Sequence, residues 1–236
     1  FLSQKNNLIL KIEYGGKNLD SDYLKNTLKP KTDHTDSERV EIAKLLVKKG
    51  LDPKLKCGED KIDALHLAFF KGLPKLANYF ISLGLDPKQI DYNGNTTLHL
   101  AVKSGNVDSM RLSLKNKVNI NALTKEDLTA LHTSIYGASM NGTDGLEFLI
   151  RSGADLLVKT KNSLSPLELI VAPEQAELFA EKKNVLELAL TKGLNQLMVK
   201  PKLTDEDFSL IQSILLKYPK LSRTLSQSKN KSLAEL

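Results

Sequence analysis

The apolar residues of the chain fall at helical spacings within short segments. Leu98 and Ala101 lie three positions apart, so they face one side of a helix that we predict to begin near Thr97. A threonine at that point can cap the helix, and the small alanine lets a partner helix approach closely. The methionine and leucines of residues 110–114 give the apolar side of a second helix. The pattern predicts a pair of short amphipathic helices.

The same pattern recurs along the chain at intervals of 33 residues. The dipeptide Leu-His occurs at positions 65–66, 98–99 and 131–132. The pentapeptide Gly-Leu-Asp-Pro-Lys occurs at Gly50–Lys54 and again at Gly84–Lys88. A unit of this length cannot bury its own apolar face, so several units must stack to form a stable core.

These repeats closely resemble the ankyrin repeat over about residues 37–195. The ankyrin consensus contains Thr-Pro-Leu-His-x-Ala, which residues 97–101 follow as Thr-Leu-His-Leu-Ala, and it ends in Leu-Leu-x-x-Gly-Ala-Asp, which Gly145–Asp155 follows. The resemblance implies an all-α solenoid of stacked helix–turn–helix units, with finger loops and a helical C-terminal cap. We expect a degenerate N-terminal repeat or cap at 1–36, the ankyrin repeat stack at 37–200, and capping helices at 201–236 that start a further segment.

Several positions depart from a regular repeat. Gly84 and Gly153 stand where a second helix ends in left-handed geometry, and Lys117 holds that place in the unit between them at some cost in strain. We predict that Gly193 ends the second helix of the next unit. Three extra residues near Ser139–Gly142 are expected to lengthen the connection between two helices.

Further elements are predicted at turns and at the two ends. The residue types at Asp91–Gly94 favour a tight turn, which would form a hairpin-like finger. In a later unit, Glu168 replaces the histidine of the motif. About seven extra residues at Pro173–Lys183 suggest an extended helix. We also expect an outer helix at Ser37–Lys49, ending at Gly50, and its inner partner at Leu8–Tyr14, before Gly15. A capping helix is expected at Thr204–Lys217, before Pro219.

Composition and charge limit the classes of partner that we expect this chain to bind. The chain has 236 residues, with 34 Lys and Arg against 28 Asp and Glu, a net charge of +6. Residues 1–61 have a balance of +3, residues 62–180 of −1 and residues 181–236 of +4. The basic excess therefore lies in the flanks, and four scattered arginines do not make a phosphate-tracking surface. We expect neither nucleic acid nor membrane as partner, although a basic flank on either one is a weaker alternative.

The histidines and the single cysteine could have either a structural or a chemical role. His66, His99 and His132 could bind a metal or act as bases, but spacing by one repeat puts their rings about 10 Å apart, too far for one metal. In an ankyrin stack they would instead hydrogen-bond the neighbouring finger. Cys57 is the only cysteine, so it cannot form an intramolecular disulfide, and its presence alone fits a reducing compartment. We place it in a finger loop, where it is a weak candidate nucleophile. We expect His34 to be a surface residue. No phosphate loop, zinc spacing or nucleophile elbow is visible, so we expect no catalytic residue, cofactor or metal.

The ankyrin resemblance places the ligand-facing residues on the finger tips and on the exposed side of the first helices. Tyr92 is the expected exposed anchor, whereas Phe70 and Tyr136 either face solvent or pack against neighbouring helices. Exposed aromatic residues beside lysines suit a binding hot spot. The complete set of positions is Glu59, Asp60, Phe70, Lys71, Tyr92, Asn93, Asn95, Lys103, Ser104, Lys125, Glu126, Leu128, Tyr136, Lys161 and Asn162.

We therefore predict a non-catalytic module that binds a partner protein through the concave ankyrin surface, as a scaffold or adaptor. We expect it to be monomeric and cytoplasmic. The chain begins with Phe1 rather than Met, which suggests a fragment. The alternative is a substrate-recruiting ankyrin domain of a larger enzyme, or of a bacterial effector secreted into host cytoplasm.

Overall fold

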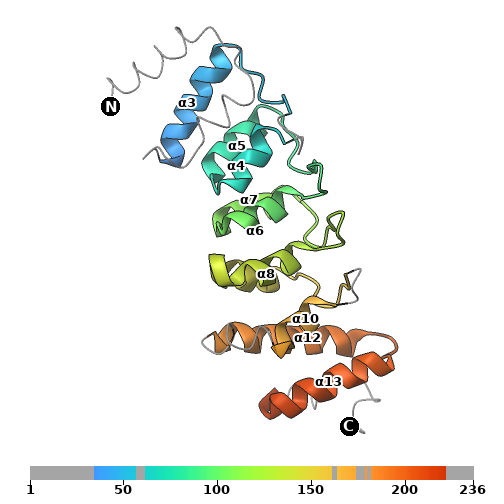
Figure 1. The fold of residues 1–236 in the computed structure, drawn as a ribbon. Coiled ribbons are helices and arrows are strands. Elements are labelled where there is room, and N and C mark those ends of the chain that lie inside the picture. Colours follow the sequence, from blue (N-terminus) through green and yellow to red (C-terminus); the bar gives the residue numbers. More distant parts are fainter. Residues whose placement is uncertain (1–34, 57–61, 161–163, 174–178, 180–181, 222–236) are drawn as a thin grey trace.

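The computed structural model describes residues 35–56, 62–160, 164–173, 179 and 182–221, which form an elongated stack of short helices (Figure 1). The elements are α3 (Asp36–Lys48), α4 (Ala64–Phe70), α5 (Pro74–Ser82), α6 (Thr97–Ser104), α7 (Val107–Lys115), α8 (Ala130–Asn141), α9 (Asp144–Arg151), α10 (Pro166–Val171), α12 (Lys183–Val199), α13 (Asp205–Lys217) and the 3₁₀ helix η2 (Pro219–Leu221).

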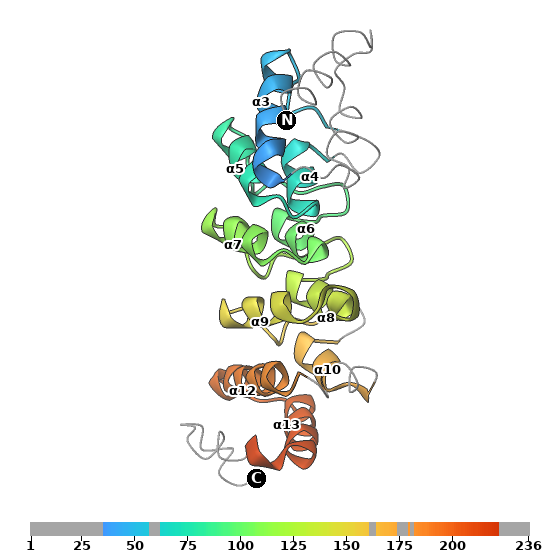
Figure 2. The same cartoon turned by 90° about the vertical axis from the view of Figure 1, so that its left-hand side faces the viewer.

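Consecutive helices pair, and the pairs stack. Helix α4 packs against α5, α6 against α7, α8 against α9, and α10 against α12. The first helices of these pairs form an inner row, and the second helices form an outer row beside it (Figure 2). Helix α3 packs on α5 and extends the outer row, while α13 packs on α12 at the opposite end. The fold is the all-α solenoid that the repeats predicted.

A side-chain cap starts the inner helices α6, α8 and α10. The Thr96 hydroxyl accepts a hydrogen bond from the backbone N–H of His99, and Nδ1 of His99 accepts one from the backbone N–H of Thr96. Thr129 with His132 repeats this reciprocal arrangement, and Ser165 forms it with the carboxylate of Glu168, which takes the place of the motif histidine in the following unit. The predicted cap at Thr97 is therefore wrong by one residue. Thr97 is the first helical residue, and its hydroxyl donates to the carbonyl of Pro87 at 2.9 Å.

The core is one continuous cluster of buried apolar side chains. Leu65, Leu98 and Leu131 repeat at 33-residue intervals and are each at most 1% exposed. Ala68 and Ala101 are completely buried, and their small size lets successive inner helices approach each other. Burial of these side chains against the neighbouring units stabilises each helix pair.

Left-handed backbone geometry follows the outer helices α5, α7 and α9, as the sequence predicted. Gly84 has a φ of 85° and Gly153 of 89°, and Lys117 adopts 60° at the equivalent position. The finger turn at Asp91–Gly94 also forms, with Gly94 at a φ of 77°. A Cβ at Gly94 would lie 2.9 Å from the backbone nitrogen of Lys125, so this turn needs glycine for space as well as for conformation.

Two predicted irregularities take a different form. The extra residues near Ser139–Gly142 extend the inner helix α8 to Asn141 rather than lengthening a connection. Gly193 does not end a helix but lies buried inside α12, which continues to Val199. A Cβ at Gly193 would lie 2.6 Å from a methyl group of Leu167, so the missing side chain serves the close approach of α10 and α12.

The end helices follow the prediction. Helix α3 begins after the N-cap Thr35 and is followed by Gly50 at a φ of 100°, and α13 begins after the N-cap Thr204. Other expected features lie outside the described residues: the Leu8–Tyr14 helix, His34, Cys57, most of the extra segment at 173–183, and the chain after 221.

Candidate protein-binding surface

Three buried histidines tie each unit to the finger of the next. Nε2 of His66 lies 3.2 Å from the carbonyl oxygen of Gln89. The same atom of His99 lies 3.1 Å from the Leu128 carbonyl, and that of His132 lies 3.4 Å from the Leu164 carbonyl. Each imidazole therefore crosses from the start of one inner helix to the following finger.

The hydrogen bonds of His99 require the neutral imidazole. Nδ1 accepts a backbone N–H from Thr96 at 3.2 Å, so Nε2 carries the proton that is donated to Leu128. Burial lowers the pKa of His99 to about 4, although the hydrogen bond to the Leu128 carbonyl raises it in part. Burial likewise lowers the pKa of His132.

The first unit uses an aspartate in place of the capping threonine. Oδ1 of Asp63 lies 2.8 Å from Nδ1 of His66 and also accepts the backbone N–H of His66. Burial raises the pKa of Asp63, but its hydrogen bond and charge interaction with His66 outweigh burial, and the net pKa is lowered. These histidines are used in holding the units together. Over the described chain, no group of three or more His, Cys, Asp or Glu could hold a metal ion.

The second finger is organised around the Asp91 carboxylate. It accepts the backbone N–H groups of Asn93 and Asn95 at 2.9 and 2.8 Å, and the side-chain amide of Asn95 at 2.8 Å. Asn95 is only 4% exposed, so the prediction that it lies on the binding surface is wrong. Its amide oxygen accepts a hydrogen bond from Lys103 at 3.1 Å, and Asn95 thereby holds the finger against α6.

Tyr92 is held between two neighbouring fingers. Its side chain is 54% exposed, and Nζ of Lys125 lies 3.7 Å from the centre of its ring, a cation–π contact. The backbone N–H of Lys125 donates to the carbonyl of Asn93 at 3.0 Å, which joins the two fingers directly. The ring is thus accessible, and the Lys125 ammonium lies against one of its faces.

The two aromatic side chains on inner helices also face solvent. Phe70, the last residue of α4, is 43% exposed, and Tyr136 in α8 is 52% exposed. Nζ of Lys71 lies 5.1 Å from the centre of the Phe70 ring. Of the two alternatives for Phe70 and Tyr136, the structure therefore supports partial exposure to solvent rather than burial against neighbouring helices.

The other candidate residues divide by exposure. Asn93, Lys103, Lys125 and Glu126 are exposed, whereas Lys71, Ser104 and Leu128 are half-buried. The carbonyl of Leu128 is already used by His99. Glu59, Asp60, Lys161 and Asn162 lie outside the described residues.

Sequence reasoning missed two exposed apolar residues on the fingers. Ile90 is 54% exposed and Leu123 is 47% exposed, and they directly precede Asp91 and Thr124. They lie 33 residues apart, so the repeat period itself could have identified them as equivalent. We call the exposed apolar and basic residues of this region the finger surface, which consists of Phe70, Ile90, Tyr92, Leu123, Lys125 and Tyr136.

Comparison with known proteins places this geometry in a family. A family model described as ankyrin repeats in three copies matches residues 65–160. Alpha-latroinsectotoxin-Lt1a of Latrodectus tredecimguttatus is 29% identical over 150 residues, which are 63% of this chain and 10% of the toxin. NF-kappa-B inhibitor alpha of Homo sapiens is 33% identical over 95 residues, 39% of this chain and 30% of the inhibitor. Tyrosine-protein kinase HTK16 of Hydra vulgaris is 29% identical over 154 residues, 58% of this chain and 19% of the kinase.

Residues 65–160 are therefore ankyrin repeats, and the described chain is an ankyrin-repeat solenoid, a protein–protein interaction module. The chain spans 10% to 30% of the length of these three relatives. Among the residues that the structure describes, no helix combines the length and the apolar character needed to cross a membrane.

Proposed function

We propose that this chain is a non-catalytic adaptor or scaffold that binds a partner protein through the finger surface, in a reducing compartment such as the cytoplasm. The observation that carries the proposal is Tyr92, an exposed ring fixed between two fingers by Lys125 at 3.7 Å. A ring that is already ordered loses little side-chain entropy on binding, which is what a hot-spot residue requires.

The surroundings of Tyr92 support the same proposal. Ile90 and Leu123 add exposed apolar area to the two joined fingers, and Phe70 and Tyr136 add aromatic area on the inner row. Exposed apolar side chains bordered by lysines resemble an interface core with a polar rim. The proposed partner presents apolar side chains that cover these rings.

The test is a double substitution, Phe70→Ala with Tyr92→Ala. Affinity capture from the native cytosol with the wild-type chain identifies the partner by mass spectrometry, and calorimetric titration then measures its affinity. We expect the double variant to weaken binding by about a hundredfold, since two hot-spot side chains of about 1–2 kcal/mol each are removed. The melting temperature should stay close to that of the wild-type chain.

Val199→Ala with Leu216→Ala is the matched control, because these side chains are 84% and 86% exposed at the C-terminal end of the stack. It removes exposed apolar area outside the finger surface and should leave affinity unchanged. Equal weakening by both double variants, or unchanged affinity of the Phe70/Tyr92 variant, would contradict the proposal.

A second candidate function rests on the lengths of the relatives. One relative is named as a tyrosine kinase, and this chain covers 19% of it. We infer as the alternative that the repeats recruit a substrate to an enzyme encoded in the same gene. The full gene sequence separates the two candidates: a catalytic domain outside these 236 residues favours recruitment, and a gene without one contradicts it.

A further inference from the structure

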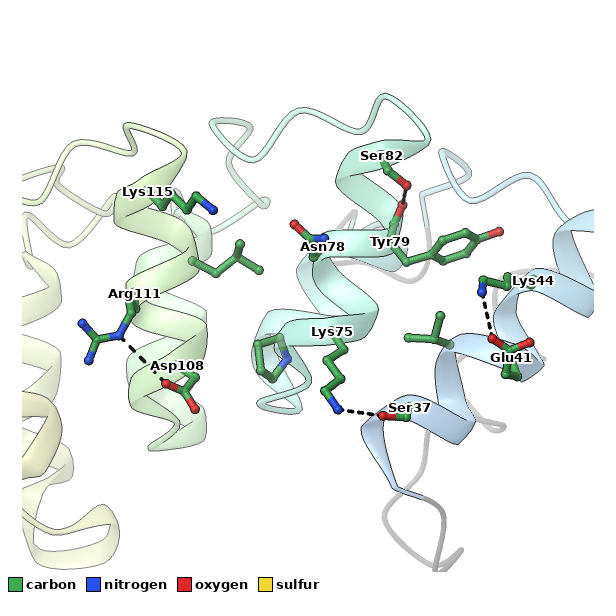
Figure 3. A pocket seen from close by; sticks show the side chains of 13 residues that line it. Ser37, Glu41, Lys44, Lys75, Asn78, Tyr79, Ser82, Asp108, Arg111 and Lys115 are labelled. Carbon is green, nitrogen blue, oxygen red and sulfur yellow. Dashed lines mark hydrogen bonds and ion pairs between the residues drawn. The ribbon is translucent and has the colours of Figure 1, made fainter. Parts of the chain in front are cut away.

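A groove of about 670 Å³ crosses the outer row of helices, between α3, α5 and α7 (Figure 3). It is separate from the finger surface, because Phe70 and Tyr136 belong to inner helices on the other side of the stack (Figure 2). Helix α5 forms the middle of the groove, with α3 and α7 on its two sides (Figure 3).

Short side chains on α5 produce the hollow. Pro74, Asn78 and Ser82 lie at helical spacing along the part of α5 that lines the groove. The neighbouring helices contribute the larger side chains of Val40 and Leu112, which are partly buried against the core. The groove therefore has apolar walls together with a polar lining from α5.

The charges that line the groove do not cancel. Glu41 pairs with Lys44 at 2.8 Å, and Asp108 lies 3.9 Å from Arg111, in each case on the same helix. Lys75 and Lys115 also line the groove, and neither forms an ion pair with any described residue. Helix α5 contains no acidic residue, so the groove keeps an excess of two positive charges.

Two polar side chains in the groove also have unused hydrogen-bonding capacity. The exposed amide of Asn78 makes no hydrogen bond to another described side chain or backbone group. The hydroxyl of Tyr79 likewise has no hydrogen-bond partner within the described ranges, although its ring packs on Phe80. Lys75 donates only to the hydroxyl of Ser37 at 2.7 Å through its side chain.

We propose that this groove binds an acidic segment of a partner protein. Carboxylates of the segment pair with Lys75 and Lys115, its backbone or side chains bond to Asn78, and an apolar residue covers Val40 and Leu112. Charge complementarity selects an acidic segment over a basic one. The groove is thus a second contact surface, on the side of the stack opposite the finger surface.

The composition of the groove favours a protein over the other anionic macromolecules. A nucleic-acid backbone carries closely spaced phosphates, and the carboxylates of Glu41 and Asp108 in the lining would repel some of them. A lipid surface is contacted by protruding apolar and basic side chains, whereas these apolar residues line a hollow. Discrete carboxylates on a peptide can match two lysines and avoid the two acidic residues.

The test uses a fluorescein-labelled peptide of alternating glutamate and leucine, and a peptide of glutamine and leucine as its neutral counterpart. Fluorescence anisotropy should detect binding of the acidic peptide only. Lys75→Gln with Lys115→Gln should weaken that binding by about tenfold or more, because both unpaired cations are removed. Lys192→Gln with Lys202→Gln removes the same charge from exposed positions far along the stack and should change affinity by less than about twofold.

A steric variant separates groove binding from general attraction to a basic protein. Asn78→Trp should block the groove without changing charge, and Asn195→Trp places the same side chain at an exposed position of α12 as a control. We expect only the first to abolish peptide binding, with unchanged melting temperatures for both. Tyr92→Ala should leave peptide affinity unchanged, so failure of the finger-surface proposal is distinguishable from failure of this one.

Three results would overturn the groove proposal. Equal weakening by the two lysine pairs would indicate non-specific attraction, and full binding by Asn78→Trp would place the peptide elsewhere. Tighter binding of phosphatidylserine vesicles or of single-stranded polythymidine than of the acidic peptide, lost in the Lys75/Lys115 variant, would assign the groove to a lipid or a nucleic acid instead.

Discussion

The ends of the outer helices show how one residue changes the local energy of a repeat. Gly84 and Gly153 carry φ values of 85° and 89°, whereas Lys117 adopts 60° at the same position. A side chain in the left-handed region costs about 1–2 kcal/mol relative to glycine. We therefore expect Lys117→Gly to raise the free energy of unfolding by about 1 kcal/mol, measured by urea denaturation.

The reciprocal change is the control for this prediction. At Gly153 an added Cβ meets no atom within 4 Å, so Gly153→Lys introduces backbone strain without a clash. It should lower the free energy of unfolding by about 1 kcal/mol. If the two substitutions shifted stability in the same direction, the strain at Lys117 would not be the cause.

The buried histidine His99 predicts a stability loss in mild acid. Its pKa is about 4 in the folded chain, against about 6.5 in the unfolded chain. Between these values the unfolded state binds more protons, so stability is complete above about pH 6.5 and falls as the pH drops toward 4. The contribution amounts to about 3 kcal/mol, and urea midpoints measured from pH 7.5 to 4.5 should show it.

His99→Gln tests whether this residue causes the pH dependence. Glutamine cannot titrate, so the variant should be less stable at neutral pH but should lose less stability on acidification than the wild-type chain. His132, whose pKa is also lowered by burial, should give the same effect in the same direction. Parallel pH curves for wild-type and His99→Gln would contradict the assignment.

At the scale of elements, one helix caps the start of another. Helix α5 has no cap from its own N-cap residue, Leu73. The carboxylate of Asp36 in α3 instead accepts the backbone N–H groups of Lys75 and Leu76, at 2.7 and 3.1 Å. Asp36→Ala should lower the free energy of unfolding by about 1–2 kcal/mol, the usual cost of losing a cap, measured by urea denaturation.

Asp144→Ala is the matched control for this capping contact. Asp144 is the first residue of α9, as Asp36 is of α3, so both variants lose an acidic residue favoured by the helix dipole. Asp144 caps no second helix among the described elements. A loss as large as that of Asp36→Ala would mean that the dipole, and not the inter-helix cap, accounts for the effect.

The repeat made most elements predictable, because its period aligns equivalent residues of several units. Helices α3, α6 and α13 lie where caps, apolar spacing and following Gly or Pro place them. Gly193 was assigned wrongly because glycine serves both helix ends and close helix contacts, and only the position of Leu167 distinguishes these uses. The extra residues before Gly142 could lengthen either a helix or a loop, since neither choice changes the apolar pattern.

The binding surface was less predictable than the fold. The exposure of Tyr92 followed from its place at a turn tip, but burial of Asn95 depends on the carboxylate of Asp91, four residues away. The groove on the outer row could not be expected from any one repeat. It forms because α3, α5 and α7 from three successive units line a single hollow.

At the scale of the whole molecule, the stack is close to one-dimensional. Among the described helices, each pair packs mainly against the pairs that precede and follow it, so local stability depends on the number of covered faces. Among the described elements, α13 packs on α12 and on η2, through buried side chains that include Ile211 and Ile214. The end of the stack should therefore open without unfolding the centre.

Hydrogen exchange can test this with two cavity-forming substitutions. Ile214→Ala should lower the stability of α13 by about 2–4 kcal/mol, so its amides should exchange faster while those of α4, α6 and α8 keep their protection. Leu131→Ala makes a similar cavity in a unit that is covered on both sides, so protection should fall in α6, α8 and α9 together. A uniform loss of protection throughout the chain after Ile214→Ala would show instead that the described units unfold as one cooperative block, and that closing the end of the stack with α13 controls the stability of every repeat.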